Sequence, residues 1–167
     1  DFGSDYFEGG SEIDTIDYTV QDQYEILNSD TGNGIKIIAD LSVGAVERSL
    51  INGGSESVDF INNIEQIVGA SGDDVFKGLE GMAGQGFTGN GETTERGDKL
   101  DFSDYAVLNS GVSITLGGSG TDGEGGTYTT LEGIEQVIGT LSGDGLTGDI
   151  NINWLFGNDN NLRFLTY

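Results

Sequence analysis

An internal duplication is the feature that most constrains the fold of this chain. The segment IEQIVG at residues 64–69 recurs 70 residues later as IEQVIG at residues 134–139, and the register then continues without a gap, so that Asp74 falls on Asp144. Two upstream matches follow the same order: residues 34–37 with 111–114, and residues 14–19 with 98–103. Two copies of one unit are typical of repeat architectures, in which neighbouring units stack and bury a shared core.

The two copies differ in the length of their connections. The offset between matched segments falls from 84 to 77 to 70 residues along the chain, so the second copy lacks seven residues in each of two Gly/Ser/Asp/Asn-rich stretches. Loops tolerate such length changes far better than strands do. The sequence therefore predicts one domain over residues 1–167, made of two tandem units that we call unit 1 (about 1–87) and unit 2 (about 88–167).

The predicted secondary structure is all-β. Short alternations of apolar and polar residues, separated by turn-forming residues, predict strands over residues 15–20, 35–41, 64–68, 99–102, 112–116 and 137–138. The chain has no proline, which suits a fold in which most backbone N–H groups enter ladders, because proline has no N–H to donate. The residues expected to stack inside are Ile16, Ile37, Ile64, Phe76, Leu100, Ile114, Ile134 and Leu146.

The charge balance excludes several classes of function. With 29 Asp and Glu against 6 Lys and Arg, the formal net charge of −23 makes nucleic acid and anionic membranes poor partners, whereas divalent cations suit such a surface. No apolar run is long enough for membrane insertion. Without His or Cys there is no Ser-His-Asp triad, no Cys nucleophile and no His-based zinc site. We therefore expect no enzyme activity, although a pair of carboxylates could in principle hydrolyse a glycoside.

Three segments approximate the nonapeptide Gly-Gly-x-Gly-x-Asp-x-U-x, in which U is apolar. They lie at residues 9–17, 69–77 and 139–147, and in each a glycine-rich turn leads to an Asp and then to a short strand. Carbonyl and carboxylate oxygens from successive turns can supply the six to eight oxygens that Ca²⁺ prefers. The alternative is that each Asp caps its own turn through a hydrogen bond. The candidate calcium ligands are Asp5, Gly9, Ser11, Asp14, Gly69, Ser71, Asp74, Asp98, Gly139, Asp144 and Asn153.

On these motifs the chain resembles the RTX, or haemolysin-type calcium-binding, repeat proteins. It is most similar to the degenerate stretches that flank their regular nonapeptides, which here read as residues 98–103, 111–114 and 134–148 and their counterparts in unit 1. The resemblance implies a right-handed parallel β-roll or β-solenoid that folds on meeting calcium. It also implies an extracellular or cell-surface location, reached in a bacterium by type I secretion.

The expected function is a non-catalytic, calcium-binding structural module: an adhesin stalk, a surface layer or a self-assembling extracellular fibre. Its partners would be calcium and either the chain itself, end to end, or a cell-surface polysaccharide. With about 20 residues per coil and strands about 4.8 Å apart, the rod would be about 40 Å long. The alternative is a polysaccharide-binding appendage of an extracellular carbohydrate-active enzyme.

Three groups of side chains have two interpretations each. Trp154, Phe156 and Phe164 form either a sugar-stacking platform or an end cap of the core. Glu65 and Glu135 form either a catalytic pair or, as the duplication favours, one structural position that occurs twice. The acidic residues 92, 95, 98, 101 and 104 form either a second cation site or a solvated edge.

Overall fold

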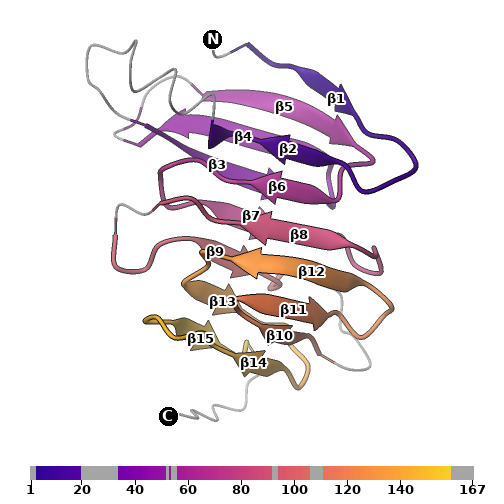
Figure 1. Cartoon of the computed structure of the whole chain (residues 1–167), viewed down its shortest axis with the longest axis vertical. Coiled ribbons are helices and arrows are strands. Elements are labelled where there is room, and N and C mark those ends of the chain that lie inside the picture. Colours follow the sequence, from indigo (N-terminus) through magenta and orange to yellow (C-terminus); the bar gives the residue numbers. More distant parts are fainter. Residues whose placement is uncertain are drawn as a thin grey trace.

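The computed structural model describes residues 3–19, 34–51, 53, 56–91, 94–105 and 111–158. Its elements are β-strands arranged in two mixed sheets. The sheets face each other, one in front of the other in Figure 1, and both extend along the long axis of the molecule. Sheet 1 has the spatial order β1 (Tyr6–Glu8), β5 (Glu56–Asn62), β4 (Ala45–Leu50), β3 (Ile35–Asp40), β7 (Val75–Lys77), β9 (Lys99–Asp101), β13 (Gln136–Ile138) and β15 (Trp154–Phe156). Sheet 2 has the order β14 (Gly145–Thr147), β10 (Ser113–Thr115), β11 (Gly118–Thr121), β12 (Thr127–Glu132), β8 (Gln85–Thr88), β6 (Gln66–Val68) and β2 (Thr15–Asp17).

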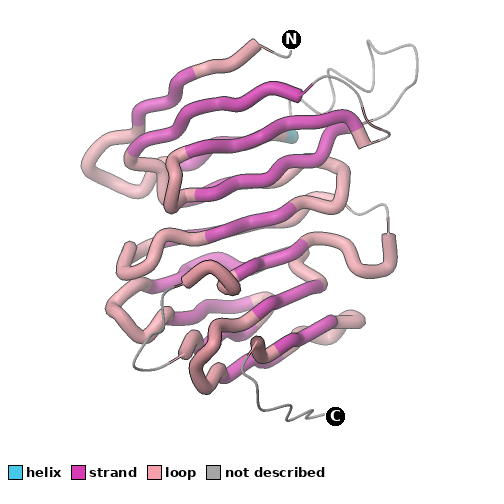
Figure 2. The backbone as a smooth tube through the Cα atoms, turned by 180° about the vertical axis from the view of Figure 1, so that it is seen from behind, coloured by secondary structure: helices cyan, strands magenta, loops and turns pink. Residues whose placement is uncertain are grey.

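Over much of its length the chain alternates between the two sheets. It passes from β5 in sheet 1 to β6 in sheet 2, back to β7 and on to β8 and β9, and it repeats this alternation from β12 to β15. Strands that become neighbours in this way pair in parallel, as β7 does with β9 and β6 with β8. Figure 2 shows from behind that the strands run across the long axis and are joined by turns at both sides.

Two antiparallel meanders interrupt the parallel pairing. In unit 1, β3 pairs with β4 and β4 with β5; in unit 2, β10 pairs with β11 and β11 with β12. Gly44 and Gly117 stand in the first tight turn of each meander with φ of 65° and 69°, a left-handed conformation that glycine adopts without strain. The all-β prediction is therefore confirmed, but the sheets are mixed rather than wholly parallel.

The core fills the space between the sheets. In β3, Ile35, Ile37 and Ala39 are fully buried while the side chains between them face outward, because successive strand residues point to opposite faces. Phe76 of sheet 1 stacks on Phe87 of sheet 2 with ring centroids 5.3 Å apart. Of the predicted core residues, all are buried except Leu146, which is half-buried on the edge strand β14 and packs against the core.

The duplication is visible in the strand pairing. Ile16 of β2 lies opposite Ile67 of β6, and the matched Leu100 of β9 lies opposite Val137 of β13. From β2 onward, each strand of unit 1 has a counterpart in unit 2 that belongs to the other sheet: β2 and β9, β3 and β10, β4 and β11, β5 and β12, β6 and β13, β7 and β14, β8 and β15. The second unit thus repeats the first after half a turn about the long axis.

One register predicted from the sequence is wrong. The sequence match pairs Ile37 with Ile114, but Ile114 lies opposite Leu146 whereas Phe76, the counterpart of Leu146, lies opposite Ala39. Ala39 and Ile114 are therefore equivalent, at an offset of 75 residues rather than 77. A shift of two residues preserves which side chains face inward, so the apolar pattern alone does not detect it.

No helix long and apolar enough to cross a membrane occurs in the part of the chain that the structure describes.

Candidate functional site

The Asp residues at the ends of the glycine-rich turns accept hydrogen bonds from their own turns. In each case the donor is the backbone N–H four residues earlier, which is the capping alternative noted for these motifs. The pairs are Gly10 N to Asp14 Oδ2 at 2.6 Å, Ala70 N to Asp74 Oδ2 at 2.7 Å and Thr140 N to Asp144 Oδ2 at 2.9 Å. Asn153 does the same for the N–H of Asp149, at 2.8 Å.

Carboxylates also join each turn to its neighbour along the stack. The longest series starts at Asp74, which accepts the N–H of Ile37 on Oδ1 at 2.7 Å and donates its own N–H to Asp98 Oδ1 at 2.7 Å. The N–H of Asp98 then donates to Glu135 Oε2 at 2.9 Å. Equivalent links run from Asp14 N to Glu65 Oε2 at 2.9 Å and from Val112 N to Asp144 Oδ1 at 3.0 Å. We call Asp14, Glu65, Asp74, Asp98, Glu135 and Asp144 the carboxylate ladder.

The carboxylates in the middle of the ladder are fully buried and therefore need hydrogen-bond donors around them. Asp74 and Asp98 are 0% exposed, whereas Asp14 and Asp144 are half-buried. A buried carboxylate is tolerated only when hydrogen bonds or charges replace its lost hydration. A Cβ at Gly69 would lie 2.2 Å from Asp74 Oδ2, and one at Gly139 would lie 2.1 Å from Asp144 Oδ2. Glycine is required at these two predicted ligand positions because the carboxylate fills the space that a side chain would occupy.

The turns fit a calcium ion unequally. At Asp74 both carboxylate oxygens face N–H donors, and Asp144 accepts the Thr140 hydroxyl at 2.8 Å in addition to two N–H groups. N–H donors compete with a cation for these oxygens, so calcium ligation at these two turns would require their hydrogen bonds to rearrange. At Asp14 the hydrogen bonds among the described residues reach Oδ2 alone. Within the residues that the structure describes, no three acidic side chains are grouped closely enough to hold a metal ion.

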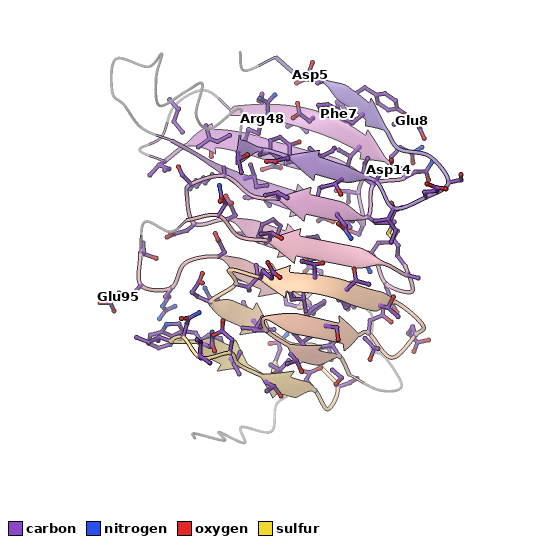
Figure 3. All side chains as sticks on the ribbon, in the orientation of Figure 1. Asp5, Phe7, Glu8, Asp14, Arg48 and Glu95 are labelled. Carbon is purple, nitrogen blue, oxygen red and sulfur yellow. The ribbon has the colours of Figure 1, made fainter. Side chains whose placement is uncertain are left out.

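The remaining predicted ligands are dispersed. Gly9 donates its N–H to the carbonyl of Asn62 at 2.9 Å, and Ser11 is exposed beside it. Asp5 is exposed directly before β1, and Ser71 is half-buried in the turn that ends in Asp74. Figure 3 shows Asp14 near the turn between β1 and β2 and Glu95 on the opposite side of the stack. The structure thus brings Asp74 and Asp98 together and places the first glycine of each predicted turn against the Asp of the same turn, so the predicted ligands lie in several separate turns.

The proposed acidic cluster around residue 98 is also divided. Asp104 pairs with Lys77 on the surface, and Asp101 lies 3.0 Å from the Lys99 ammonium. Burial by itself would raise the pKa of Asp101, but hydrogen bonds from Ser103 and Lys99 outweigh it and hold the pKa below its ordinary value. Residue 92 lies outside the described residues.

A buried ion pair that the sequence analysis missed lies near the N-terminal end of the stack. The Nη2 atom of Arg48 donates to Asp59 Oδ1 at 2.8 Å, and the hydroxyl of Tyr18 donates to Asp59 Oδ2 at 3.0 Å. Asp5 adds its backbone N–H at 3.0 Å, and Asp5 and Arg48 are both labelled in Figure 3. Burial and the neighbouring Asp59 carboxylate raise the pKa of Tyr18. Opposite charges at inward positions of adjacent strands were the signal that could have revealed this pair.

An open groove of about 480 Å³ lies beside the turn after β3. Tyr6 and Phe60, paired across β1 and β5, are 66% and 55% exposed at its rim. Among the described residues that line it there is no carboxylate and no cationic side chain. The lining residues are Tyr6, Leu41, Ser42, Val43, Gly44, Phe60, Ile61, Asn62, Asn63, Ile64, Leu79 and Met82.

The predicted platform at Trp154 has a different environment. The guanidinium of Arg96 lies 5.2 Å from the centre of the Trp154 ring, a cation–π geometry that covers one face of the indole. Trp154 and Phe156 are each partly exposed on β15, and Phe164 lies outside the described residues.

Comparisons of the chain with models of protein families, with curated proteins and with solved structures found no match.

Proposed function

We propose that this chain is a non-catalytic structural module of a secreted or cell-surface protein, built on the β-roll or β-solenoid principle with one antiparallel meander inserted in each unit. The alternation of the chain between two sheets and the parallel pairing of β7 with β9 and of β9 with β13 support this architecture. The secreted location follows from the resemblance to RTX proteins.

The observation that carries the proposal is the carboxylate ladder. In the series from Asp74 through Asp98 to Glu135, acidic side chains are engaged by backbone N–H groups of neighbouring strands. Such groups are occupied in holding the backbone and are not presented to a substrate. The repeated glutamates fit the same role, because Glu65 and Glu135 accept the N–H of Asp14 and of Asp98 respectively. The ladder joins adjacent strands as an ion between turns would.

Calcium ligation, which the resemblance implies, is the competing account of how adjacent turns are joined. The turn at Asp14 is where it has most room, because that residue is half-buried and its hydrogen bond from Gly10 engages one carboxylate oxygen. The exposed acidic surface favours divalent cations in a different way, because counterions reduce the repulsion that a net charge of −23 creates.

Metal removal distinguishes these accounts. We expect a β-type far-UV circular dichroism spectrum and a cooperative thermal transition in excess chelator, because N–H groups already satisfy the ladder. Calcium and magnesium should raise Tm by similar amounts at matched ionic strength, since both screen the same charges. A spectrum that becomes β-type only with calcium would contradict the proposal. A calcium-specific rise in Tm that Asp14→Asn abolishes would assign the ion to that turn.

The groove beside the turn after β3 supports a second candidate, polysaccharide binding. Tyr6 and Phe60 are paired across β1 and β5 at its rim, and the lining includes Asn62 and Asn63. Exposed aromatic faces stack on sugar rings, and amides supply hydrogen bonds of both kinds.

Affinity electrophoresis against a panel of neutral and acidic polysaccharides tests the second candidate. Tyr6→Ala and Phe60→Ala should each weaken binding by about tenfold, because a lost aromatic contact costs about 1 kcal/mol or more. Trp154→Phe is the matched control, since its ring is partly covered by Arg96. If Trp154→Phe weakens binding and the two groove variants do not, the site lies at β15 instead.

A further inference from the structure

We propose that the C-terminal edge of one copy of this chain binds the N-terminal edge of a second copy, in the register that already joins unit 1 to unit 2. The inference rests on the proposed structural function and names its partner. Within the described residues, β14 and β2 are the two outer strands of sheet 2, at opposite ends of the stack (Figure 1). Each therefore presents a row of backbone groups that can pair with another strand.

The junction between the units shows how such edges pair. Strand β7 ends unit 1 in sheet 1 and pairs in parallel with β9, so that Phe76 lies opposite Leu100. The N–H of Lys99 donates to the carbonyl of Asp74 at 2.8 Å, and the N–H of Asp74 donates to the Asp98 side chain at 2.7 Å. The junction thus combines an apolar pair facing the core with two hydrogen bonds between the strands.

The outer strands of sheet 2 carry the same elements. Strand β14 is the counterpart of β7 and β2 is the counterpart of β9, so the same register places Leu146 of one copy opposite Ile16 of the next. The N–H of Thr15 takes the place of the Lys99 N–H and reaches the carbonyl of Asp144. On Asp14 the hydrogen bond of its own turn engages Oδ2, and Oδ1 matches the atom of Asp98 that accepts the junction N–H.

In sheet 1, the proposed junction exchanges one outer strand for another. Strand β8 makes two parallel pairings at the internal junction, with β6 and with β12. Strand β15 pairs with β13 as β8 pairs with β6, and β1 pairs with β5 as β8 pairs with β12. Strands β15 and β1 therefore each make one of the two pairings that β8 makes. At a junction between two copies, a single strand makes both pairings. All three residues of β1 are exposed, and in the proposed junction β15 of one copy takes the place of β1 of the next.

The interface is heterologous, since one end of the molecule binds the other. An interface of this kind leaves both ends free again after each addition and builds open filaments unless the rotation closes a ring. The acidic charge opposes the approach of two copies, so association strengthens as salt rises toward the concentration at which the charges are screened.

Engineered cysteines test the register, because the natural chain has none. Thr15→Cys combined with Gly145→Cys places two exposed residues at positions equivalent to the paired Lys99 and Val75. Adjacent strands are about 4.8 Å apart, within the range for a disulfide, whereas a shift of two residues moves the Cα atoms to about 8 Å, beyond it. We expect a ladder of covalent oligomers on non-reducing gels from this variant. The out-of-register control, Thr15→Cys with Thr147→Cys, should give little.

Two further variants complete the test. Asn62→Cys with Phe156→Cys should cross-link as well, because β15 would bring residue 156 to the place that Glu8 holds opposite Asn62. Thr15→Pro removes an edge N–H and should abolish oligomers in sedimentation velocity while the circular dichroism spectrum is unchanged. Monomers at all salt concentrations, or equal cross-linking in and out of register, would overturn the proposal. Either result would leave the chelator experiment unaffected, so the two proposals fail separately.

Discussion

Replacing Asp59 with alanine should lower the free energy of unfolding by about 3–5 kcal/mol, because the change removes the nearest counter-charge of a buried guanidinium. Arg48 and Asp59 are 2% and 1% exposed, and their side chains meet at 2.8 Å between the sheets. Asp59 also accepts the hydroxyl of Tyr18 and the N–H of Asp5, so the variant removes the acceptor of three donors at once. Urea unfolding followed by circular dichroism measures the loss.

The neighbouring Asp5 is the control for charge alone. Its carboxylate lies 3.9 Å from the same Arg48 nitrogen, but its side chain is 62% exposed. Exposed ion pairs contribute about 1 kcal/mol or less, so Asp5→Ala should change stability little. Arg48→Met combined with Asp59→Leu should be less destabilising than Asp59→Ala, since removing both charges leaves none uncompensated. A loss below about 1 kcal/mol for Asp59→Ala would show that water reaches the pair.

The strands of the core followed from the sequence because alternation is a local signal. In β3 the buried isoleucines and Ala39 alternate with outward residues, as the pattern over residues 35–41 predicts. The meanders were missed for the opposite reason. Strands β4 and β11 follow tight turns at Gly44 and Gly117, and they carry polar or small residues such as Arg48 and Gly120 at positions that a strand pattern expects to be apolar. These segments form strands because they pair with their neighbours in the meander. The alternation of apolar and polar residues within a segment does not indicate such pairing.

The sequence was enough to predict where the Asp-containing turns lie, but not which role each Asp has. The turns that end in Asp14, Asp74 and Asp144 have the residue types that calcium ligation needs, and they also have those that capping needs. Which role applies depends on the groups that the neighbouring strand presents, and for Asp74 this group is the N–H of Ile37, which adds to the N–H of Ala70 from its own turn. That neighbour lies 37 residues away in sequence. The duplication is informative here, because Glu65 and Glu135 recur in the same ladder role.

The second large effect is expected at Asp74. Asp74→Ala should lower the free energy of unfolding by about 3–5 kcal/mol, because two buried N–H groups lose an ionised acceptor and each such loss costs about 1–3 kcal/mol. The donors are the backbone groups of Ile37 and Ala70, both at 2.7 Å. Residue 74 is 0% exposed, so water cannot replace the carboxylate without opening the turn. Urea unfolding in chelator keeps any metal contribution out of the comparison.

The duplication supplies the matched control for Asp74. Asp144 is its counterpart and accepts the same two kinds of N–H, from Thr140 and Val112, but it is half-buried on the outer side of the stack. Water can reach its donors after truncation, so Asp144→Ala should cost about 1–2 kcal/mol, as the loss of an exposed helix cap does. Equal losses at the two positions would mean that burial does not set the strength of the ladder. A small loss at Asp74 together with calcium-dependent folding would transfer its role to an ion.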